Sequence, residues 1–520
     1  MDYKHFGVML DCSRNAVMKP ESVKKMIDIL SVMGYNCLEL YTEDTYELPD
    51  EPYFGYMRGR YTQEELRDID AYARSKNMEL MPCIQTLAHF TNLVKHAAYA
   101  DIVDCGDILL CGDEKTYALF DKIFAFLSET FTSRNVNIGM DEAFLVGLGK
   151  YLAQHGYQKR YEILLNHLQR ICTIAAKYGF HCHMWSDMIF RLKNDGVDDA
   201  AIPRNVALTY WDYYHDTEEH YSRRIEEHQA LGREVWFAGG AWSWHGFAPL
   251  NAYTLKNSLP AMKSVRSHGI ENVLITMWGD NGKECSFYSL LPSLYAIRRY
   301  ADGVYDEAQI KAEFDRLFSL PYDAFMLLDL PNVVKDRPLM SESICKTLLY
   351  SDPFMGIADV EAAKMPPIPY HDYADRLAAY KDHAEYGYIF DSMSKLCRVL
   401  AHKYDLGIRI RKAYLANDKV GLHMIAADEI PDLIRDLEHF YHAYRHLWYT
   451  ENKPFGFEIQ DVRLGGVMWR LRAVAERILL YVEGGIHKIE ELDEVVLPRS
   501  PGNTMIGHIP YVNCISAGCI

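Results

Sequence analysis

One pattern recurs through the first three hundred residues: a short apolar or β-branched run, followed by a stretch whose apolar residues have helical spacing. The runs that we predict to be strands are His5–Asp11, Asn36–Asp44, Met78–Gln85, Asn135–Glu142, His181–Asp187, Asn205–Asp212, Glu234–Trp242 and Asn272–Asp280. Strands that alternate with helices pair in parallel. Eight such units in about 300 residues favour a closed (β/α)8 TIM barrel over an open doubly wound sheet. No glycine-rich phosphate loop follows the first run, which also argues against the open sheet.

The intervening segments carry helix start and stop signals. Thr62 and Glu65 have the spacing of a capping box, and glycines such as Gly34 and Gly179 stand where helices should end. We expect helices at Glu21–Met33, Thr62–Lys76, Thr116–Phe131, Tyr161–Tyr178, Glu219–Leu231, Leu255–Ser267 and Leu290–Tyr300, with a short fifth connection.

The pattern changes after Ala301. Long helical stretches are predicted at Tyr373–Ala416, Gly421–Trp448 and Asp461–Tyr481. We therefore predict two domains, a catalytic barrel at residues 1–305 and a mainly α-helical C-terminal domain at residues 306–520. The aromatic residues of the helical region are compatible with a homodimer.

The composition is that of a folded protein and excludes some partners. Apolar residues make up 49% of the 520 residues, and 55 Lys+Arg against 72 Asp+Glu give a net charge of −17. Because nucleic acids bind basic surfaces, this charge argues against a nucleic-acid partner. We see no secretory signal and no apolar run of about 18 residues, so we expect no membrane span and a cytoplasmic location. The 12 cysteines lack CxxC spacing, which is typical of reduced thiols and not of a zinc site.

Acidic and tryptophan side chains gather at the predicted carboxyl ends of the strands, where barrel enzymes place their active sites. Five of the eight tryptophans lie at such ends: Trp185, Trp211, Trp242, Trp244 and Trp278. Indole faces stack on the apolar face of a sugar ring, and carboxylates accept hydrogen bonds from its hydroxyl groups. The arrangement therefore favours a carbohydrate pocket.

The pair Asp141–Glu142 follows the fourth predicted strand at the same end of the barrel. Ordinary glycosidases place two carboxyl groups on opposite sides of the scissile bond, about 5–9.5 Å apart, which sequence neighbours rarely achieve. Adjacent acids can instead share one task. Glu142 would protonate the leaving oxygen, with its pKa raised by burial and by the neighbouring charge. Asp141 would orient a 2-acetamido group whose carbonyl oxygen attacks the sugar carbon, giving an oxazolinium intermediate.

These residues resemble glycoside hydrolase family 20, the β-N-acetylhexosaminidases. The resemblance is carried by Leu10-Asp11-Cys12-Ser13-Arg14, Ile138-Gly139-Met140-Asp141-Glu142, Trp185-Ser186-Asp187, Trp211 and Trp278-Gly279-Asp280, and it spans residues 1–305. The family usually carries an extra α/β domain before the barrel. Here the first strand is predicted at His5, so the resemblance implies a compact member with a helical C-terminal region.

The resemblance implies an exo-acting, retaining enzyme that removes terminal GlcNAc or GalNAc from an oligosaccharide or glycoside, without metal or cofactor. It assigns the general acid/base to Glu142 and the acetamido contact to Asp141. It also assigns sugar hydroxyl contacts to Arg14 and Asp280, support of the catalytic acids to His89, and the walls of the pocket to Trp185, Trp211 and Trp278. We add Trp242 and Trp244 as substrate-binding candidates from the seventh strand end.

Three positions depart from the family pattern. Met140 replaces the second glycine of Gly-Gly-Asp-Glu, and Asn137 replaces the preceding histidine. No tyrosine on the seventh strand is available to bind the acetamide, so Tyr213 or Tyr210 on the sixth strand is the candidate for that role.

Two other functions remain open from the residues alone. His181, His183 and Asp187 give a superficial ligand set for a metal-dependent barrel hydrolase. A non-catalytic sugar-binding barrel is the other alternative, although the presence of both Asp141 and Glu142 argues against it.

Overall fold

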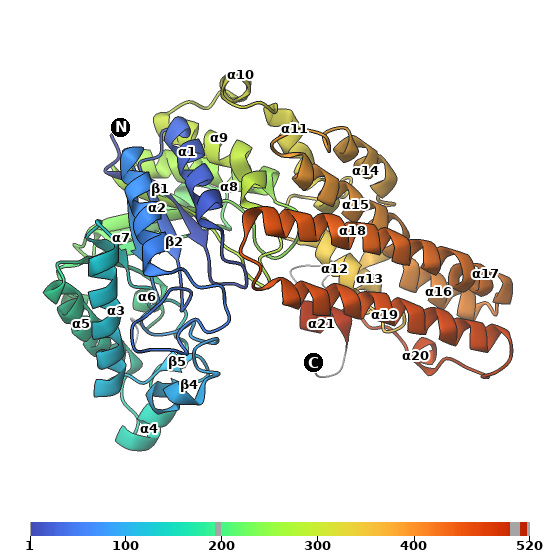
Figure 1. The fold of residues 1–520 in the computed structure, drawn as a ribbon, viewed down its shortest axis with the longest axis horizontal. Helices are drawn as coiled ribbons and strands as arrows, with labels where there is room; N and C mark the ends of the chain where they lie inside the picture. Colours follow the sequence, from blue (N-terminus) through green and yellow to red (C-terminus); the bar gives the residue numbers. More distant parts are fainter. Residues whose placement is uncertain (1, 193–198, 500–509, 517–520) are drawn as a thin grey trace. The chain divides into compact units, whose positions relative to one another are not determined.

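The computed structural model describes residues 2–192, 199–499 and 510–516. Its eight-stranded sheet closes into a parallel barrel with helices outside it, as predicted (Figure 1). Around the barrel the order is β1 (His5–Asp11), β10 (Asn272–Met277), β9 (Val235–Gly240), β8 (Val206–Trp211), β7 (His181–Trp185), β6 (Asn135–Asn137), β3 (Glu79–Cys83) and β2 (Cys37–Tyr41). All these neighbours pair in parallel, and β1 closes the ring by pairing with β10 from His5–Asn272 to Leu10–Met277.

Every barrel strand except β1 ends earlier than the sequence predicted, most clearly β6. The predicted strand Asn135–Glu142 forms a ladder only over Asn135–Asn137. Gly139 and Met140 adopt φ of 71° and 78°, and a left-handed backbone cannot continue a β-ladder. The residues that follow therefore leave the sheet at the mouth of the barrel.

The barrel helices follow their predicted signals. In α2 (Gln63–Ser75) both hydrogen bonds of the Thr62–Glu65 capping box are present, which confirms that prediction. The other helices are α1 (Pro20–Met33), which ends at Gly34 with φ 88°, α3 (Glu114–Thr130), α4 (Lys150–His155), α5 (Arg160–Lys177), α6 (Asp187–Leu192), α7 (Glu218–Gln229), α8 (Asn251–Ser267) and α9 (Leu291–Asp302).

The sequence analysis missed a small hairpin between β3 and α3. It consists of β4 (Val103–Cys105) and β5 (Ile108–Leu109), which pair antiparallel after a short 3-10 segment. The Asp104 carboxylate accepts hydrogen bonds from the backbone N–H groups of Gly147 and Tyr151, at 2.9 and 2.8 Å. The hairpin thereby holds the segment that follows Glu142.

Residue contacts divide the chain into two interleaved units. The first contains 1–241, 254–278 and 293–313, and the second contains 242–253, 279–292 and 314–520. Two segments that follow β9 and β10 in the chain thus pack with the helical part. The boundary between residues 305 and 306 stays a prediction.

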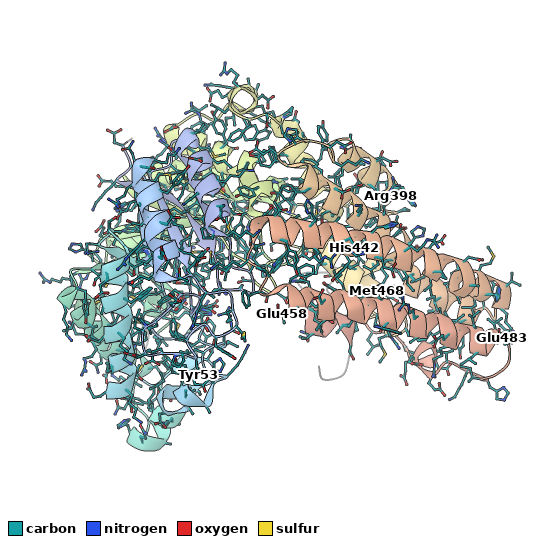
Figure 2. The ribbon with its side chains drawn as sticks, in the orientation of Figure 1. Tyr53, Arg398, His442, Glu458, Met468 and Glu483 are labelled. Carbon is teal, nitrogen blue, oxygen red and sulfur yellow. The ribbon has the colours of Figure 1, made fainter. Side chains whose placement is uncertain are left out.

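The second unit is helical. Its longest elements are α15 (Gly387–Lys403), α18 (Ile430–Glu451) and α19 (Phe457–Val482), and α18 contacts both others. Figure 2 labels Glu458 and Met468 in α19 and Glu483 directly after its last residue. The predicted stretch Tyr373–Ala416 is divided into α14 (Tyr370–Ala378), α15 and α16 (Leu406–Leu415), and a π-helical turn at Ile425–Glu429 joins α17 (Lys419–Met424) to α18. None of the helices in the described residues is long and apolar enough to cross a membrane.

Both segments inserted from the barrel loops are fixed inside the second unit. The Phe247 ring packs edge-on against Phe440 and Tyr444, with centroids 5.4 and 5.2 Å apart. The Glu284 side chain is fully buried and accepts hydrogen bonds from Lys346 Nζ at 2.6 Å and Arg463 Nη1 at 2.9 Å. A buried charge needs such partners, because removing one leaves the other charges uncompensated.

We expect Glu284→Gln to lower the free energy of unfolding by about 3–5 kcal/mol, because Lys346 and Arg463 would keep their charges without a counterion. Urea denaturation measures this loss. The matched control is Glu218→Gln, which breaks a solvent-exposed pair with Lys263 and should have a much smaller effect. Equal effects of the two substitutions would contradict the prediction.

Candidate active site

Arg14 lies just after β1 and is held by two carboxylates. The Asp11 side chain accepts hydrogen bonds from the backbone N–H groups of Ser13 and Arg14, and its second oxygen accepts Arg14 Nη1 at 3.0 Å. Arg14 Nε lies 3.3 Å from Glu43 Oε1. Burial raises the pKa of Glu43 to about 7, although Arg14 and Arg58 favour its ionised form. The guanidinium fork is therefore fixed before any substrate arrives.

The same guanidinium lies against two aromatic rings. Its central carbon is 4.8 Å from the ring centroids of both Tyr41 and Trp278. These two rings meet edge-on, with centroids 4.8 Å apart. Such cation–π contacts orient Arg14 between rings from β2 and from the end of β10, the two strands that flank β1.

Asp141 is buried and is bound by two side chains that follow β3. Gln85 Nε2 donates to Asp141 Oδ1 at 2.8 Å, and His89 Nε2 lies 3.1 Å from Asp141 Oδ2. Burial opposes ionisation, but the His89 charge and these hydrogen bonds hold the pKa of Asp141 below its usual value. Asp141 is therefore an ionised hydrogen-bond acceptor.

Steric contact at Gly139 and a left-handed backbone at Met140 define the segment before Asp141. A Cβ on Gly139 would lie 2.1 Å from Gln85 Oε1, so only glycine fits beside the Gln85 amide. Met140, where the resembled family has glycine, adopts a positive φ of 78° although it carries a side chain. Such backbone strain persists only where surrounding packing enforces it, and it turns the segment toward the barrel mouth.

The His89 imidazole lies close to both adjacent acids. It lies in the loop after β3 with φ 63°, 3.1 Å from Asp141 and 3.8 Å from Glu142 Oε2. Burial would lower the pKa of this imidazole, but the Asp141 carboxylate outweighs that effect and raises the pKa to about 9. His89 thus supplies the positive charge that keeps Asp141 ionised.

Glu142 differs from its neighbour because its side chain is 42% exposed. The burial that we expected for this carboxyl group is therefore wrong: the left-handed turn, with φ 53° at Glu142, projects it toward solvent. The Glu142 backbone N–H donates to Asp187 Oδ2 at 3.1 Å. The Asp187 side chain is 9% exposed, and desolvation together with the Asp141 charge raises its pKa to about 7.

Four of the predicted aromatic residues form one connected wall. Trp278 Nε1 donates to Tyr213 Oη at 3.1 Å, and the Tyr213 ring stacks on Trp211 with centroids 5.3 Å apart. Trp185 lies on the other side of Trp278, with ring centroids 5.9 Å apart. Tyr213, not Tyr210, therefore joins the tryptophans, because Tyr210 Oη donates to Asp212 instead.

Three of the residues predicted to bind the sugar belong to the second unit. Trp242 and Trp244 stack on each other with centroids 3.9 Å apart, and both are buried. Asp280 follows β10 and also belongs to this unit. Their roles in binding sugar stay predictions.

The metal ligand set proposed from the sequence does not assemble. His181 and His183 line a cavity of about 290 Å³ with Lys4 and Trp236, at the amino ends of the strands. His183 pairs with buried Glu39 at 3.0 Å. Asp187 instead lies at the carboxyl end of β7, where it binds the backbone of Glu142. His181 and Asp187 stand at opposite ends of the strand, so that joint ligand set is wrong.

The structure adds three residues that the sequence analysis had not selected, Tyr41, Glu43 and Gln85, and gives Asp187 a contact other than the metal ligation considered for it. Each follows or ends a barrel strand, so strand-end position was the available signal. Their partners could not be read from the sequence, because Gln85 reaches Asp141 only through the pairing of β3 with β6.

Comparisons with known proteins find related sequences and structures. Residues 3–231 match the family model described as "Glycosyl hydrolase family 20, catalytic domain", and residues 323–508 match "Glycoside Hydrolase 20C C-terminal domain". Hexosaminidase D from Bos taurus is 23% identical over 261 residues, which cover 47% of this chain and 72% of that protein. Hexosaminidase D from Homo sapiens is 22% identical over 338 residues, covering 59% and 68%. A Flavobacterium johnsoniae chitobiase structure has a TM-score of 0.49 at 15% identity, covering 94% of this chain and 74% of that one.

We expect the His89 imidazole to stay protonated through neutral pH and to titrate near pH 9. Since its folded-state pKa lies above the unfolded value of about 6.5, its stabilising contribution is complete below pH 6.5 and is lost as the pH rises through 9. The unfolding free energies of the wild type and His89→Gln should therefore differ most at pH 6.5 and converge toward pH 10. Urea denaturation across this range tests the convergence, and an NMR titration of His89 near pH 6.5 would contradict it.

Proposed function

This chain belongs to glycosyl hydrolase family 20, and from that premise we propose that it is an exo-acting, retaining β-N-acetylhexosaminidase. Its substrates are oligosaccharides or glycosides with a terminal β-linked N-acetylhexosamine. The observation that carries the proposal is the contrast between two adjacent acids: Asp141 is buried and bound by His89 and Gln85, whereas Glu142 is half exposed. One acid is fixed for orientation and the other is accessible for proton transfer.

The contrast supports substrate-assisted catalysis. Asp141 accepts the N–H of the 2-acetamido group and stabilises the charge that develops as the acetamido carbonyl oxygen attacks the anomeric carbon. The glycosidic bond breaks while Glu142 gives its proton to the leaving oxygen, and an oxazolinium ion forms. Water then attacks the anomeric carbon, gives a proton back to Glu142 and reopens the ring. Two displacements at one carbon retain its configuration.

The surrounding residues support recognition of the terminal sugar. Arg14 presents a fork with fixed geometry for the sugar hydroxyls, and Lys cannot reproduce that fork. Trp185, Trp211 and Trp278 provide aromatic faces for the ring and the acetamido methyl group, and Tyr213 is the candidate donor to the acetamide. Asp280, Trp242 and Trp244 remain candidate contacts. A homodimer and a cytoplasmic location also remain predictions.

Glu142→Gln and Asp141→Asn should each lower the kcat for an aryl 2-acetamido-2-deoxy-β-glycoside by about 10²–10⁴-fold, because each removes a group that acts in the transition state. Glu162→Gln on α5, an acid outside the mouth, is the control and should leave kcat unchanged. Aryl β-glycosides without the 2-acetamido group should not be hydrolysed, and a thiazoline mimic of the oxazoline should inhibit. Activity within about tenfold of wild type in either variant would contradict the proposal. Turnover by the wild type also excludes a non-catalytic sugar-binding protein.

Arg14→Lys should lower kcat/KM by about 10–100-fold, because an ammonium cannot contact Asp11 and Glu43 together while lying against two rings. Arg170→Lys is the matched control, since Arg170 also pairs with a carboxylate and covers a tyrosine ring, but on the outer helices. Steady-state kinetics should show a loss in the first variant only. Equal kcat/KM for Arg14→Lys and wild type would contradict the proposal that Arg14 binds the sugar hydroxyl groups.

A further inference from the structure

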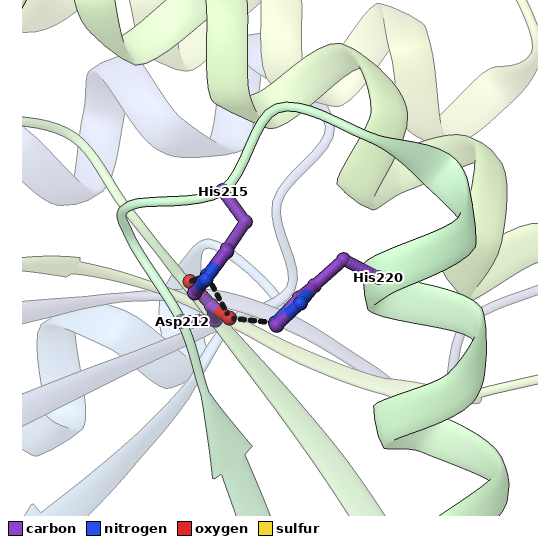
Figure 3. A group of neighbouring side chains, drawn as sticks. All are labelled: Asp212, His215 and His220. Atoms are coloured by element: carbon purple, nitrogen blue, oxygen red, sulfur yellow. Dashed lines mark hydrogen bonds and ion pairs between the residues drawn. The ribbon is translucent and has the colours of Figure 1, made fainter.

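Three metal-binding side chains meet in the connection between β8 and α7. Asp212 directly follows β8, His215 lies three residues later, and His220 is in the first turn of α7 (Figure 3). His215 Nδ1 lies 2.9 Å from each Asp212 oxygen, and His220 Nε2 lies 3.0 Å from Asp212 Oδ2. Among the described residues, this is the one group of three or more such side chains whose ligand atoms all lie within 4.8 Å of one another.

The Asp212 carboxylate is held by groups outside the cluster. Tyr210 Oη donates to Asp212 Oδ2 at 2.8 Å, and the backbone N–H of Tyr214 donates to Oδ1 at 3.0 Å. The carbonyl of His215 accepts Tyr221 Oη at 2.7 Å, which fixes the loop against α7. Hydrogen bonds of this kind orient the ligands of protein metal sites and raise their affinity.

We propose that Asp212, His215 and His220 bind a divalent cation of the zinc class. Two imidazoles and one carboxylate are ligands that Zn²⁺ accepts, and three protein ligands leave a position for water. The nitrogen atoms of His215 and His220 that face Asp212 donate to its carboxylate, and binding would replace those protons with the cation.

Binding of one ion by all three side chains requires the His215 imidazole to turn. The His215 and His220 rings are parallel within 8°, with centroids 3.5 Å apart, so their nitrogen lone pairs cannot converge on one ion. His215 is 49% exposed and can turn about its side-chain torsions. Asp212 and His220 are less exposed and would keep their places.

The position of the site suggests what the cation does. Asp212 lies between Trp211 and Tyr213, which stack on each other, and Tyr213 accepts the Trp278 indole hydrogen bond. A bound ion would fix this loop and, if the proposed function holds, one wall of the sugar pocket. It would take no part in proton transfer, so hydrolysis should continue after the metal is removed.

The test is metal binding by the full chain without a histidine tag, after treatment with a chelator and dialysis. Zinc bound per chain is measured by mass spectrometry, and affinity by competition with a chromophoric chelator. We expect one tightly bound equivalent in the wild type and at least about tenfold weaker binding in His215→Ala and in His220→Ala. His268→Ala is the matched control, because His268 also pairs with a carboxylate, Glu226, but belongs to no such cluster. It should bind like the wild type.

Two further measurements distinguish zinc bound at this cluster from zinc bound elsewhere on the chain. Zinc should raise the Tm of the wild type and of His268→Ala, but not that of the His215→Ala/His220→Ala double variant, whose fold is checked by circular dichroism. Co²⁺ bound by the wild type should show the intense visible absorption of a four-coordinate ion. Wild-type zinc binding no tighter than that of the double variant would overturn the proposal. Binding that survives His215→Ala unchanged would overturn it as well, and neither result bears on turnover by Glu142.

Discussion

The pairing of β1 with β10 is the constraint on which the site depends. Residues separated by more than 260 positions become neighbours when His5–Leu10 pair with Asn272–Met277. Only this closure brings the Arg14 guanidinium against Trp278, since the two follow the first and last strands of the barrel. Trp278 in turn donates a hydrogen bond to Tyr213, and the Tyr213 ring stacks on Trp211. A sheet left open at this seam would separate the arginine from the aromatic wall.

Three carboxyl groups with little solvent exposure at the mouth differ in pKa because their neighbours differ. Glu43 and Asp187 have pKa values raised to about 7, since burial is their main influence. Asp141 is equally enclosed, yet its pKa is lowered because His89 contributes a positive charge and Gln85 a hydrogen bond. The pKa of Asp141 is lowered because His89 and Gln85 favour its ionised form, whereas burial dominates at Glu43 and Asp187. Glu142 differs from these three acids because the left-handed turn of its backbone directs its side chain toward solvent.

The sequence allowed the barrel to be predicted because apolar periodicity and helix caps are local signals. The same logic found Arg14, Asp141 and Trp278, since parallel strands bring their carboxyl ends to one edge. It could not find the Gln85–Asp141 contact, which needs strand register, nor the left-handed backbone at Met140, which a side-chain-bearing residue rarely adopts. It also placed Trp242 and Trp244 by strand position alone, whereas their packing is with the helical unit. The long predicted helix Tyr373–Ala416 failed for a related reason, because propensity does not reveal where tertiary packing divides a helix.

The interleaving of the two units has a consequence for how the chain is made. Phe247 and Glu284 leave the ribosome well before Tyr444 and Arg463, the residues that enclose them. During synthesis the barrel strands can pair in order. The segments after β9 and β10 can pack only once the last helices have been synthesised. Until α19 has been translated, the nascent barrel therefore carries two loops that lack their packing partners. A chain stopped near residue 305 would keep them permanently in that state.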